Sequence, residues 1–362
     1  MAEALIDEPA DPVDTGATVA TILEAQLPSG MIPWFPGGHA DPWNHVEALL
    51  ALSSAGEFAA AARGFEWLAR AQRADGSWHA YYSGDGGVEQ ARIDTNGVAY
   101  VATGVLVHLW ASDDRGFAEE MFAIVDRALG FVVAHTGESG EIPWSVGPSG
   151  RPAEFSLLAA SSSIRQSLCS GVRLAAELGL ERPAWAEAAV RVGRLVATRE
   201  RFFADRSQFA MDWYYPALAG GLDLAAARAR LARRSRRFVL PGRGVLCRSD
   251  RRWVTTAETA ECAVALCRAG WSEEAAALLS TTGELRCDDG SYLTGLVYPE
   301  RSEFPAGERT TYSAAAVVVA ADLLSGGVSG AVFDRLPPIS DPTGPSCGRA
   351  RGGCRIPLPC PR

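Results

Sequence analysis

The sequence contains no lysine. Its 34 Lys+Arg side chains are therefore all arginine. Phosphate-binding Walker loops, pyridoxal-dependent enzymes and protein kinases each need a lysine, so its absence excludes these three classes. The 43 Asp+Glu side chains bring the formal net charge to −9. This acidic balance argues against a nucleic-acid-binding protein, whose surface would be basic.

The sequence also has no long apolar run and no cysteine motif. No stretch approaches the roughly 18–20 consecutive apolar residues of a membrane span, and the acidic first residues lack the apolar core of a secretory signal. The eight cysteines form no Cys-x-x-Cys pair, a pattern that favours free thiols in a reducing cytoplasm over disulfides or a zinc site. These absences predict a globular protein of the cytoplasm without a transmembrane segment.

A short turn that contains glycine recurs along the chain and divides it into units of roughly fifty residues. The turns occupy residues 26–34, 72–78, 137–144, 241–245 and 288–292, and a degenerate copy lies near Ser207. Apolar residues recur at helical spacing in the stretches around these turns. The stretches are 15–26, 43–55, 57–73, 94–111, 115–134, 155–179, 183–199, 211–220, 222–235, 255–269, 271–282 and 309–325.

Helices in antiparallel pairs predict an all-α fold, the (α/α)6 toroid, in which six helical hairpins close into a barrel. An open helical solenoid is the alternative. We favour closure because the helix at 15–26 has no partner unless it contacts the last helix, 309–325. The expected domains are a flexible N-terminus (1–14), a single toroid domain (15–335) and a disordered tail rich in Pro, Gly, Arg and Cys (336–362).

One of the turns matches a known motif. The matching residues are Arg63, Gly64, Leu68, Gln72, Gly76 and Trp78. They resemble the QW repeat of squalene–hopene-type triterpene cyclases, which also occurs in the β subunits of protein prenyltransferases. Residues 15–325 resemble bacterial proteins described as prenyltransferase-like. The resemblance implies an α/α toroid in which the Gln72 amide caps the turn and Trp78 stacks over it, and it implies prenyl transfer or terpene cyclisation as the activity.

The catalytic motifs of those enzymes are missing from this sequence. Triterpene cyclases protonate their substrate with an Asp-x-Asp-Asp motif, and neither the pair Asp113 and Asp114 nor the pair Asp288 and Asp289 has the preceding aspartate. No aspartate-rich motif for magnesium diphosphate occurs, and no histidine follows His135 to complete a zinc site. The resemblance therefore implies the fold and leaves the reaction open.

The chain also resembles the six-hairpin glycosidases, such as glucoamylase-like enzymes, which place paired carboxylates and aromatic rings at the mouth of the same toroid. The inner helices of a toroid point their N-termini to one face, so their first turns converge on a funnel. Polar and aromatic residues collect at the starts of all the expected inner helices. Glycosyl chemistry uses one carboxyl that donates a proton and a second carboxylate that activates water or attacks the sugar.

We predict that Asp94 and Glu258 form the acid/base pair of this funnel, and that Asp41 and Asp212 are carboxylates that position the substrate. A glutamate buried beside aromatic rings can keep its proton near neutral pH. The competing interpretation is structural, because aspartate is a common N-cap and glutamate is favoured in the first turn of a helix.

The remaining candidates are expected to bind the substrate. They are Trp34, His39, Trp43, Asn44, His45, Asn96, Arg165, Trp213, Tyr214, Tyr215, Glu261 and Arg309. Aromatic faces stack on a sugar ring or an apolar chain. Without lysine, the cations that clamp an anionic group would be Arg165, Arg301 or Arg309. The alternatives are that the rings fill the core, that His45 is a packing residue and that the arginines pair with buried carboxylates.

These observations predict an enzyme that acts on a sugar-containing or lipid-linked small molecule, by hydrolysis or transfer at a glycosyl centre. The alternatives are prenyl transfer or terpene cyclisation, and a non-catalytic toroid that binds a ligand. We expect no cofactor and no metal ion, because the cluster of His39, Asp41 and His45 lacks tight metal-ligand spacing. We expect no nucleic-acid partner, and a peripheral membrane or enzyme partner stays open.

Overall fold

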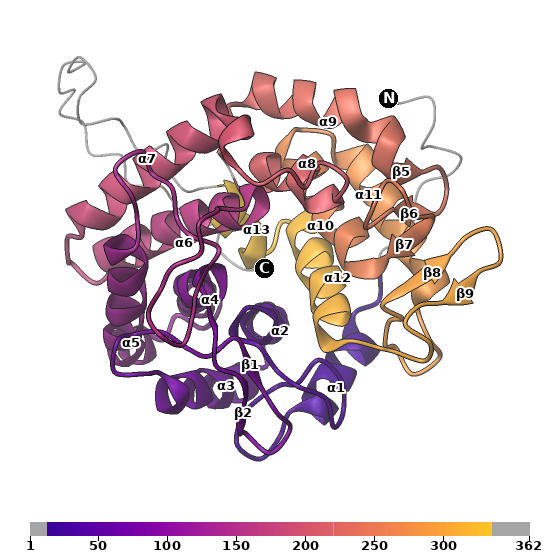
Figure 1. The fold of residues 1–362 in the computed structure, drawn as a ribbon. Coiled ribbons are helices and arrows are strands. Elements are labelled where there is room, and N and C mark those ends of the chain that lie inside the picture. Colours follow the sequence, from indigo (N-terminus) through magenta and orange to yellow (C-terminus); the bar gives the residue numbers. More distant parts are fainter. Residues whose placement is uncertain (1–12, 220, 335–362) are drawn as a thin grey trace, which may run out of the picture.

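Six helices form a closed inner ring in the computed structural model, which describes residues 13–219 and 221–334. Each ring helix packs against the next one along the chain and the last packs against the first, so the ring has no free edge (Figure 1). The ring helices are α2 (Pro42–Ser54), α4 (Thr95–Ser112), α6 (Leu158–Glu177), α8 (Ala210–Leu218), α10 (Thr256–Arg268) and α12 (Thr311–Leu324).

A second layer of helices surrounds this ring (Figure 1). The outer helices are α1 (Gly16–Ala25), α3 (Phe58–Ala71), α5 (Arg115–Ala134), α7 (Pro183–Thr198), α9 (Leu224–Phe238) and α11 (Ser272–Ser280). Five of them pack against the inner helix that precedes them in the chain, whereas α1 packs against α12 at the other end of the sequence. The predicted all-α (α/α)6 toroid, closed by its N-terminal helix, is confirmed.

Short antiparallel strands lie in the loops before the inner helices. The pairs are β1 (Tyr81–Tyr82) with β2 (Val88–Gln90), β3 (Ile93–Asp94) with β4 (Ser145–Val146), and β5 (Val239–Leu240) with β6 (Gly244–Val245), and a three-stranded sheet has the order β7 (Trp253–Thr255), β8 (Gly295–Val297), β9 (Ser302–Glu303). Two 3-10 helices, η2 (Glu200–Phe202) and η3 (Thr281–Leu285), complete the loops. Strands β3 and β7 run directly into α4 and α10, so strand pairing fixes where these two helices begin.

The turn that matches the QW repeat joins consecutive outer helices. The side-chain amide of Gln72 donates to the carbonyl oxygens of Gly76 (3.0 Å) and of Ile124 on α5 (2.9 Å). The Trp78 indole N–H donates to a main-chain carbonyl of α3 (2.8 Å). Gly76 has φ +89°, and a Cβ atom there would lie 2.3 Å from the carbonyl oxygen of Arg127. The motif is thus a structural clamp, as the sequence interpretation proposed for Gln72.

The same docking recurs around the toroid. Gly30, Gly140 and Gly290 also have positive φ angles, and each approaches the main chain of a neighbouring outer helix too closely for a Cβ atom. Gln26 donates to Gly30 (3.1 Å) as Gln72 does to Gly76. Gly290 contacts Ala17 on α1, where a Cβ atom on residue 290 would lie only 2.6 Å from the alanine Cβ. The repeated turn therefore also joins the last unit to the first.

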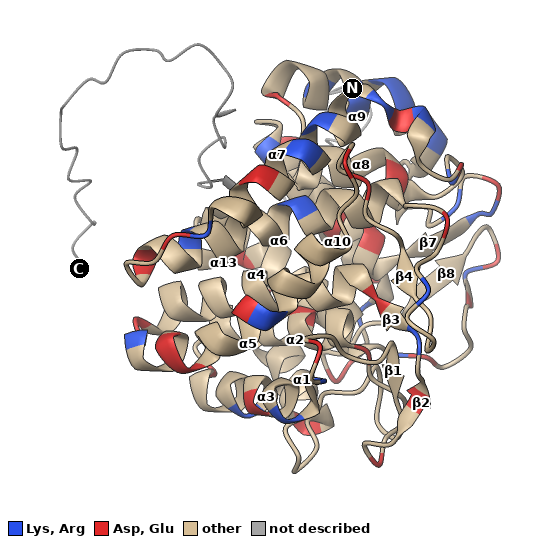
Figure 2. Cartoon of the chain, turned by 60° about the vertical axis from the view of Figure 1, so that its left-hand side comes forward, with Lys and Arg blue, Asp and Glu red and all other residues tan. Residues whose placement is uncertain are grey.

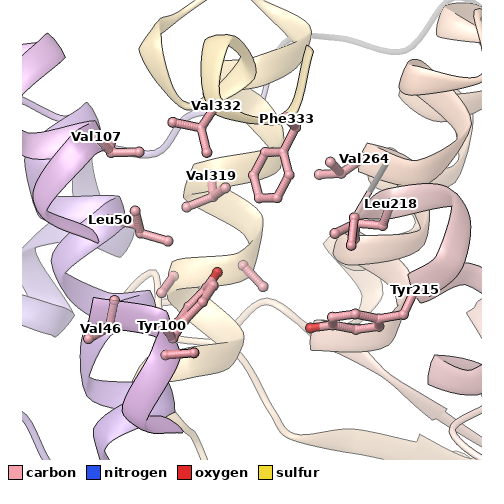
Figure 3. Packing of buried hydrophobic residues seen from close by; sticks show 14 of the residues in the cluster. Val46, Leu50, Tyr100, Val107, Tyr215, Leu218, Val264, Val319, Val332 and Phe333 are labelled. Atoms are coloured by element: carbon pink, nitrogen blue, oxygen red, sulfur yellow. The ribbon is translucent and has the colours of Figure 1, made fainter. Parts of the chain in front are cut away.

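Helix α13 (Val328–Asp334) was not predicted, and it blocks one end of the ring. Val332 and Phe333 point into the interior formed by the inner helices (Figure 3). The Gln166 side chain on α6 donates to the carbonyl of Val332 (2.8 Å), which fixes the helix from inside the barrel. In the described part of the chain, the toroid is thus closed at this end and open at the face where the inner helices begin. The expected tail, 336–362, and nearly all of the expected flexible N-terminus lie outside the described residues.

Charged side chains are unevenly distributed on the surface (Figure 2). Helix α9 carries six arginines and no acidic residue, whereas the loops near the strands carry both red acidic and blue basic positions. Among the helices that the structure describes, none combines the length and the apolar character needed to cross a bilayer. The outer helix α9 is thus a strongly basic element of the surface.

The docking of Gly76 on α5 yields the first prediction. Gly76→Ala places a Cβ atom against the carbonyl of Arg127 in a left-handed backbone conformation, and we expect it to lower the free energy of unfolding by about 2–4 kcal/mol. Gly130→Ala, in the interior of α5 with nothing within 4 Å, is the matched control and should be neutral or raise stability by about 0.5–1 kcal/mol. Urea unfolding measures both, and equal effects of the two substitutions would contradict the clamp.

Candidate active site

A cavity of about 420 Å³ opens where the inner helices begin. The first turns of α2, α4, α8, α10 and α12 form its wall together with β1, β3 and β7. Six aromatic rings line it: Trp34, Trp43, Tyr81, Trp144, Trp253 and Tyr312. Four carboxyl groups and one cation accompany them: Asp41, Asp94, Glu258, Glu261 and Arg92. The cavity thus combines apolar ring faces with several acids, which is the chemistry expected of a sugar site.

Asp94 is the N-cap of α4, and only one of its two oxygens serves the cap. Its Oδ1 accepts hydrogen bonds from the main-chain N–H groups of Asn96 (3.0 Å) and Gly97 (3.3 Å). Its Oδ2 lies 3.5 Å from the Arg92 guanidinium. Burial raises the pKa of Asp94, the nearby carboxylate of Asp41 raises it further, and the cap donors and Arg92 oppose both effects. Oδ1 of Asp94 thus caps the helix, whereas Oδ2 is held by Arg92 and takes no part in the cap.

Asp41, the N-cap of α2, has donors on both oxygens. Oδ1 accepts from the main-chain N–H groups of Trp43 (2.9 Å) and Asn44 (3.0 Å). Oδ2 accepts from the Trp34 indole and from the Asn44 amide, both at 2.6 Å. Burial raises the pKa of Asp41, and these four donors oppose the rise because they favour the ionised form. Asp41 thus fixes Trp34 and Asn44 in the cavity wall, and its oxygens are already occupied.

Glu258 faces Asp94 from the opposite side of the ring. It lies in the first turn of α10, which is separated from α4 by two inner helices in either direction. The hydroxyl of Thr255 donates to its Oε2 at 2.5 Å, and the thiol of Cys247 forms a hydrogen bond with the same side chain. These two hydrogen bonds fix the orientation of the Glu258 side chain. Asp94 and Glu258 consequently approach one cavity from opposite walls.

A deeper acidic layer lies beneath the cavity. Glu261, one turn below Glu258, accepts hydrogen bonds from the phenols of Tyr214 and Tyr215. Glu47 on α2 accepts from the phenol of Tyr100 (2.7 Å). Tyr100 and Tyr215 face the barrel interior from opposite sides (Figure 3). The lining of the small internal cavity enclosed there includes both glutamates and, among the described residues, no arginine.

The two buried glutamates share an interior to which the described residues contribute no positive charge. Burial raises the pKa of Glu261 to about 8, and the charge of Glu47 adds to that rise. Burial also raises the pKa of Glu47 to about 7, against the Tyr100 hydrogen bond. Two carboxylates in one apolar interior repel each other, so this layer holds protons at neutral pH.

Half of the predicted site residues line the cavity. They are Trp34, Asp41, Trp43, Asn44, Asp94, Asn96, Glu258 and Glu261. Tyr214 and Tyr215 lie behind Glu261 and contact the cavity only through it. The expectation that acids and aromatic rings converge from the starts of several inner helices is therefore correct for these residues.

Asp212 does not join the other carboxylates. Its Oδ1 accepts the main-chain N–H of Ala159 at the start of α6 (3.1 Å), and the side chain lines a separate cavity beside Glu200 and Arg206. Burial raises the pKa of Asp212 to about 6. The preceding residue, Met211, lines the funnel instead. The prediction that Asp212 lies in the funnel is therefore wrong. Consecutive side chains on an α-helix point in directions about 100° apart, so Met211 faces the funnel and Asp212 faces away from it.

The two histidines and Trp213 are also outside the lining. His45 accepts the main-chain N–H of Ile32 at Nδ1 (3.1 Å) and contacts the carbonyl of Gly64 through Nε2 (3.1 Å), so it is neutral and structural. Burial lowers the pKa of His45 to about 4. His39 packs edge-on against Trp34 with centroids 4.5 Å apart. Trp213 donates its indole N–H to a carbonyl of α9, on the outer side of the ring.

The arginines predicted to clamp an anion lie elsewhere. Arg165 on α6 donates to the carbonyl of Ala219 (3.2 Å), between the inner and outer layers. Arg309 pairs with Asp289 at the surface (3.0 Å), and Arg301 lies 4.0 Å from Glu284, also at the surface. A long, charged side chain needs solvent or a polar partner. Each of these arginines finds its partner outside the funnel.

Arg92 is the cation that the sequence interpretation missed. Its guanidinium lies over the Trp144 ring, 4.4 Å from the centroid, and next to Asp94. The pairing of β3 with β4 brings these two residues together across a long stretch of sequence. Tyr81 lies in a rim strand, where no helix-start pattern points to it, and it was missed. Trp253 and Tyr312 lie at the starts of α10 and α12 and also line the cavity, but they were not among the selected site residues.

In the described part of the chain, no group of three or more His, Cys, Asp or Glu side chains is arranged to hold a metal ion.

No protein-family model matches the sequence. The chain is 44% identical over 308 residues, 85% of each protein, to a protein of Mycolicibacterium hassiacum named "MMP endo-(1,4)-3-O-methyl-alpha-D-mannosidase".

Two solved structures share the fold at low sequence identity. A wild-type glycosidase superposes with a TM-score of 0.71 at 15% identity and covers 86% of this chain and 96% of its own. A D-mannose isomerase superposes with a TM-score of 0.66 at 11% identity, over 85% and 95% of the two chains. These two structures show the shared fold. Together with the mannosidase relative they support the resemblance to six-hairpin glycosidases, and none of the three supports the prenyltransferase or terpene cyclase resemblance.

The buried glutamates yield the second prediction. The folded-state pKa of Glu47 lies above its ordinary value of 4.5, so its proton stabilises the fold at pH 5 and this contribution is lost as the pH rises through 7. Between pH 5 and 8.5 we expect the free energy of unfolding of the wild type to fall by about 2 kcal/mol more than that of Glu47→Gln. Urea unfolding at both pH values measures the difference. The exposed Glu120→Gln should follow the wild type, and parallel behaviour of Glu47→Gln would show that Glu47 is ionised throughout.

Proposed function

The chain belongs to the same family as the MMP endo-(1,4)-3-O-methyl-alpha-D-mannosidase of Mycolicibacterium hassiacum, and from this membership we propose that it hydrolyses α-1,4 bonds between 3-O-methylated mannose units. The chain is an enzyme of the glycoside hydrolase kind. We assign the reaction to the funnel of a single toroid domain, residues 15–335. The observation that carries the proposal is the pair Asp94 and Glu258, which enter one aromatic cavity from opposite inner helices.

Asp94 is the proposed general acid. Cleavage of a glycosidic bond requires a proton on the leaving oxygen, and a carboxyl supplies it only if its pKa is high enough to retain the proton near neutral pH. Burial and the neighbouring Asp41 both raise the pKa of Asp94. Its Oδ2 is not used by the helix cap, so the proton can be delivered without unwinding the start of α4.

Glu258 is the proposed base or nucleophile. Hydrogen bonds with Thr255 and Cys247 fix the orientation of its side chain. In the mechanism that inverts the anomeric carbon this carboxylate removes a proton from the attacking water, and in the retaining mechanism it attacks that carbon itself. Proton NMR of the first-formed product distinguishes the two, because the anomeric configuration is inverted in the former and kept in the latter.

The aromatic wall is proposed to bind the sugar rings. Tryptophan and tyrosine rings pack against the apolar face of a hexose, and a methyl ether enlarges that apolar surface. Trp144 is held by the Arg92 guanidinium, and Trp253 by a hydrogen bond from its indole to the carbonyl of Phe304 (2.9 Å). The rings thus have fixed positions before the substrate binds, which reduces the entropy lost on binding.

The acid/base assignment gives the third prediction. Asp94→Asn and Glu258→Gln should each lower kcat on a 3-O-methylated α-1,4-mannooligosaccharide by about 100- to 10,000-fold, because each removes a proton-transfer or attacking group. Asp212→Asn is the matched control: it is also a buried carboxyl at the start of an inner helix, but it lies outside the cavity and should keep kcat within about 3-fold. Full activity of Asp94→Asn would remove Asp94 from the mechanism.

Arg92 gives the fourth prediction. Its positive charge lowers the pKa of Asp94, and a general acid stops working as the pH rises through its pKa. Arg92→Gln should therefore shift the alkaline limb of the kcat/KM profile to higher pH, whereas Arg92→Lys keeps the charge and should leave the limb in place. The groups that also act on Asp94 are Asp41 and Tyr81, and they are unchanged in both variants. If Arg92→Gln lowers activity while the alkaline limb of the kcat/KM profile stays at the same pH, Arg92 has only a structural role.

A further inference from the structure

Two polar atoms in the cavity wall have no partner among the described residues. They are the indole nitrogen of Trp43 and the amide oxygen of Asn96, and both are buried. Comparable groups in the same wall are occupied by the protein itself. The Trp253 indole donates to Phe304, and the Asn44 amide donates to Asp41. The Trp43 indole N–H is thus a donor, and the Asn96 amide oxygen an acceptor, that the described residues leave without a partner.

Both residues are held firmly, next to the proposed acid. The Trp43 ring stacks on Tyr100, with centroids 5.1 Å apart and an interplanar angle of 18°. The main-chain N–H of Asn96 donates to Asp94 (3.0 Å), which fixes Asn96 two residues after the acid. The first turns of α2 and α4 touch, since a Cβ atom on Gly97 would lie 3.6 Å from the main-chain nitrogen of Trp43. The donor and acceptor therefore belong to adjacent, rigid helix starts.

A free hydroxyl is the group that matches this pair. It accepts a hydrogen bond from an indole N–H and donates one to an amide oxygen, whereas a methyl ether cannot donate. We propose that Trp43 and Asn96 are specificity-determining residues that bind one free hydroxyl of the mannose ring beside Asp94. This inference rests on the proposed function. A substrate without that hydroxyl leaves a buried donor and acceptor unpaired, and such sites discriminate strongly.

The position of Asp94 identifies the hydroxyl. In a 1,4-linked, 3-O-methylated mannose unit, O1 and O4 are in linkages and O3 carries the methyl group, so O2 and O6 remain free. The acid must reach the glycosidic oxygen at the anomeric carbon, and C2 is the neighbour of that carbon. Because Asn96 follows Asp94 by two residues, we assign the pair to the 2-hydroxyl. Hydrogen bonds to this hydroxyl strengthen as the transition state forms, so its loss should affect kcat as well as KM.

The test compares the 3-O-methylated α-1,4-mannotetraose with its 2-deoxy and 6-deoxy forms. For the wild type we expect kcat/KM to fall about 100-fold or more without the 2-hydroxyl and less than about 10-fold without the 6-hydroxyl. Trp43→Phe keeps a ring on Tyr100 without the N–H, and Asn96→Ala removes the amide. Each should lower kcat/KM on the parent substrate and reduce the penalty for 2-deoxy substitution to about 10-fold or less.

Trp253→Phe is the matched control. It removes an indole N–H from the same wall, but this N–H already donates to the carbonyl of Phe304. Its 2-deoxy penalty should equal that of the wild type. A wild-type penalty at the 6-hydroxyl instead of the 2-hydroxyl, or an unchanged 2-deoxy penalty in Trp43→Phe and Asn96→Ala, would overturn the inference. These outcomes leave the proposed function intact as long as Asp94→Asn is inactive. Calorimetric binding of the three tetrasaccharides to Asp94→Asn gives the same ranking without turnover.

Discussion

Thr311, at the start of α12, donates its main-chain N–H to the carbonyl of Trp34 and its hydroxyl to the carbonyl of Pro33, both at 2.7 Å. These bonds join the last inner helix to the loop of the first unit, on the rim of the cavity. Gly290 makes the same connection in the outer layer by docking on Ala17. An open solenoid would leave α12 and α2 apart and the funnel without one wall. Closure of the chain on itself is thus the constraint on which the site depends.

The carboxylates at the mouth serve the fold and the site together. Asp41 and Asp94 cap two adjacent inner helices, so the structural interpretation of these aspartates and the functional one apply to the same residues. The difference lies in the second oxygen. In Asp41 it is held by two donors, and in Asp94 the one donor that the described residues supply to it is the Arg92 guanidinium. A helix cap needs one oxygen, which leaves the other for chemistry only where no further donor reaches it.

The cavities inside the ring contain several carboxyl groups and few cations, in keeping with a sequence that has no lysine. Glu47 and Glu261 lie in an enclosed layer with phenols as their hydrogen-bond donors, and the cavity above contains one cation, Arg92, among its described lining residues. The site is consequently acidic and aromatic. It suits a neutral sugar, whose hydroxyls pair with carboxylates and amides, more than an anionic diphosphate. The composition that first excluded enzyme classes therefore also agrees with the chemistry of the funnel.

The sequence alone determined the helices, the hairpin repeat and the closed toroid, because helical periodicity and the glycine turns are local properties of the chain. It also placed Asp94, Glu258 and Trp43 at helix starts that must converge. Only the tertiary structure decided which face of each first turn points inward, and so separated Met211 from Asp212. It likewise brought Arg92 over Trp144 through a strand pair, and it filled the far end of the ring with α13. Rotation about a helix axis and contacts between distant strands are set by packing, which no local pattern records.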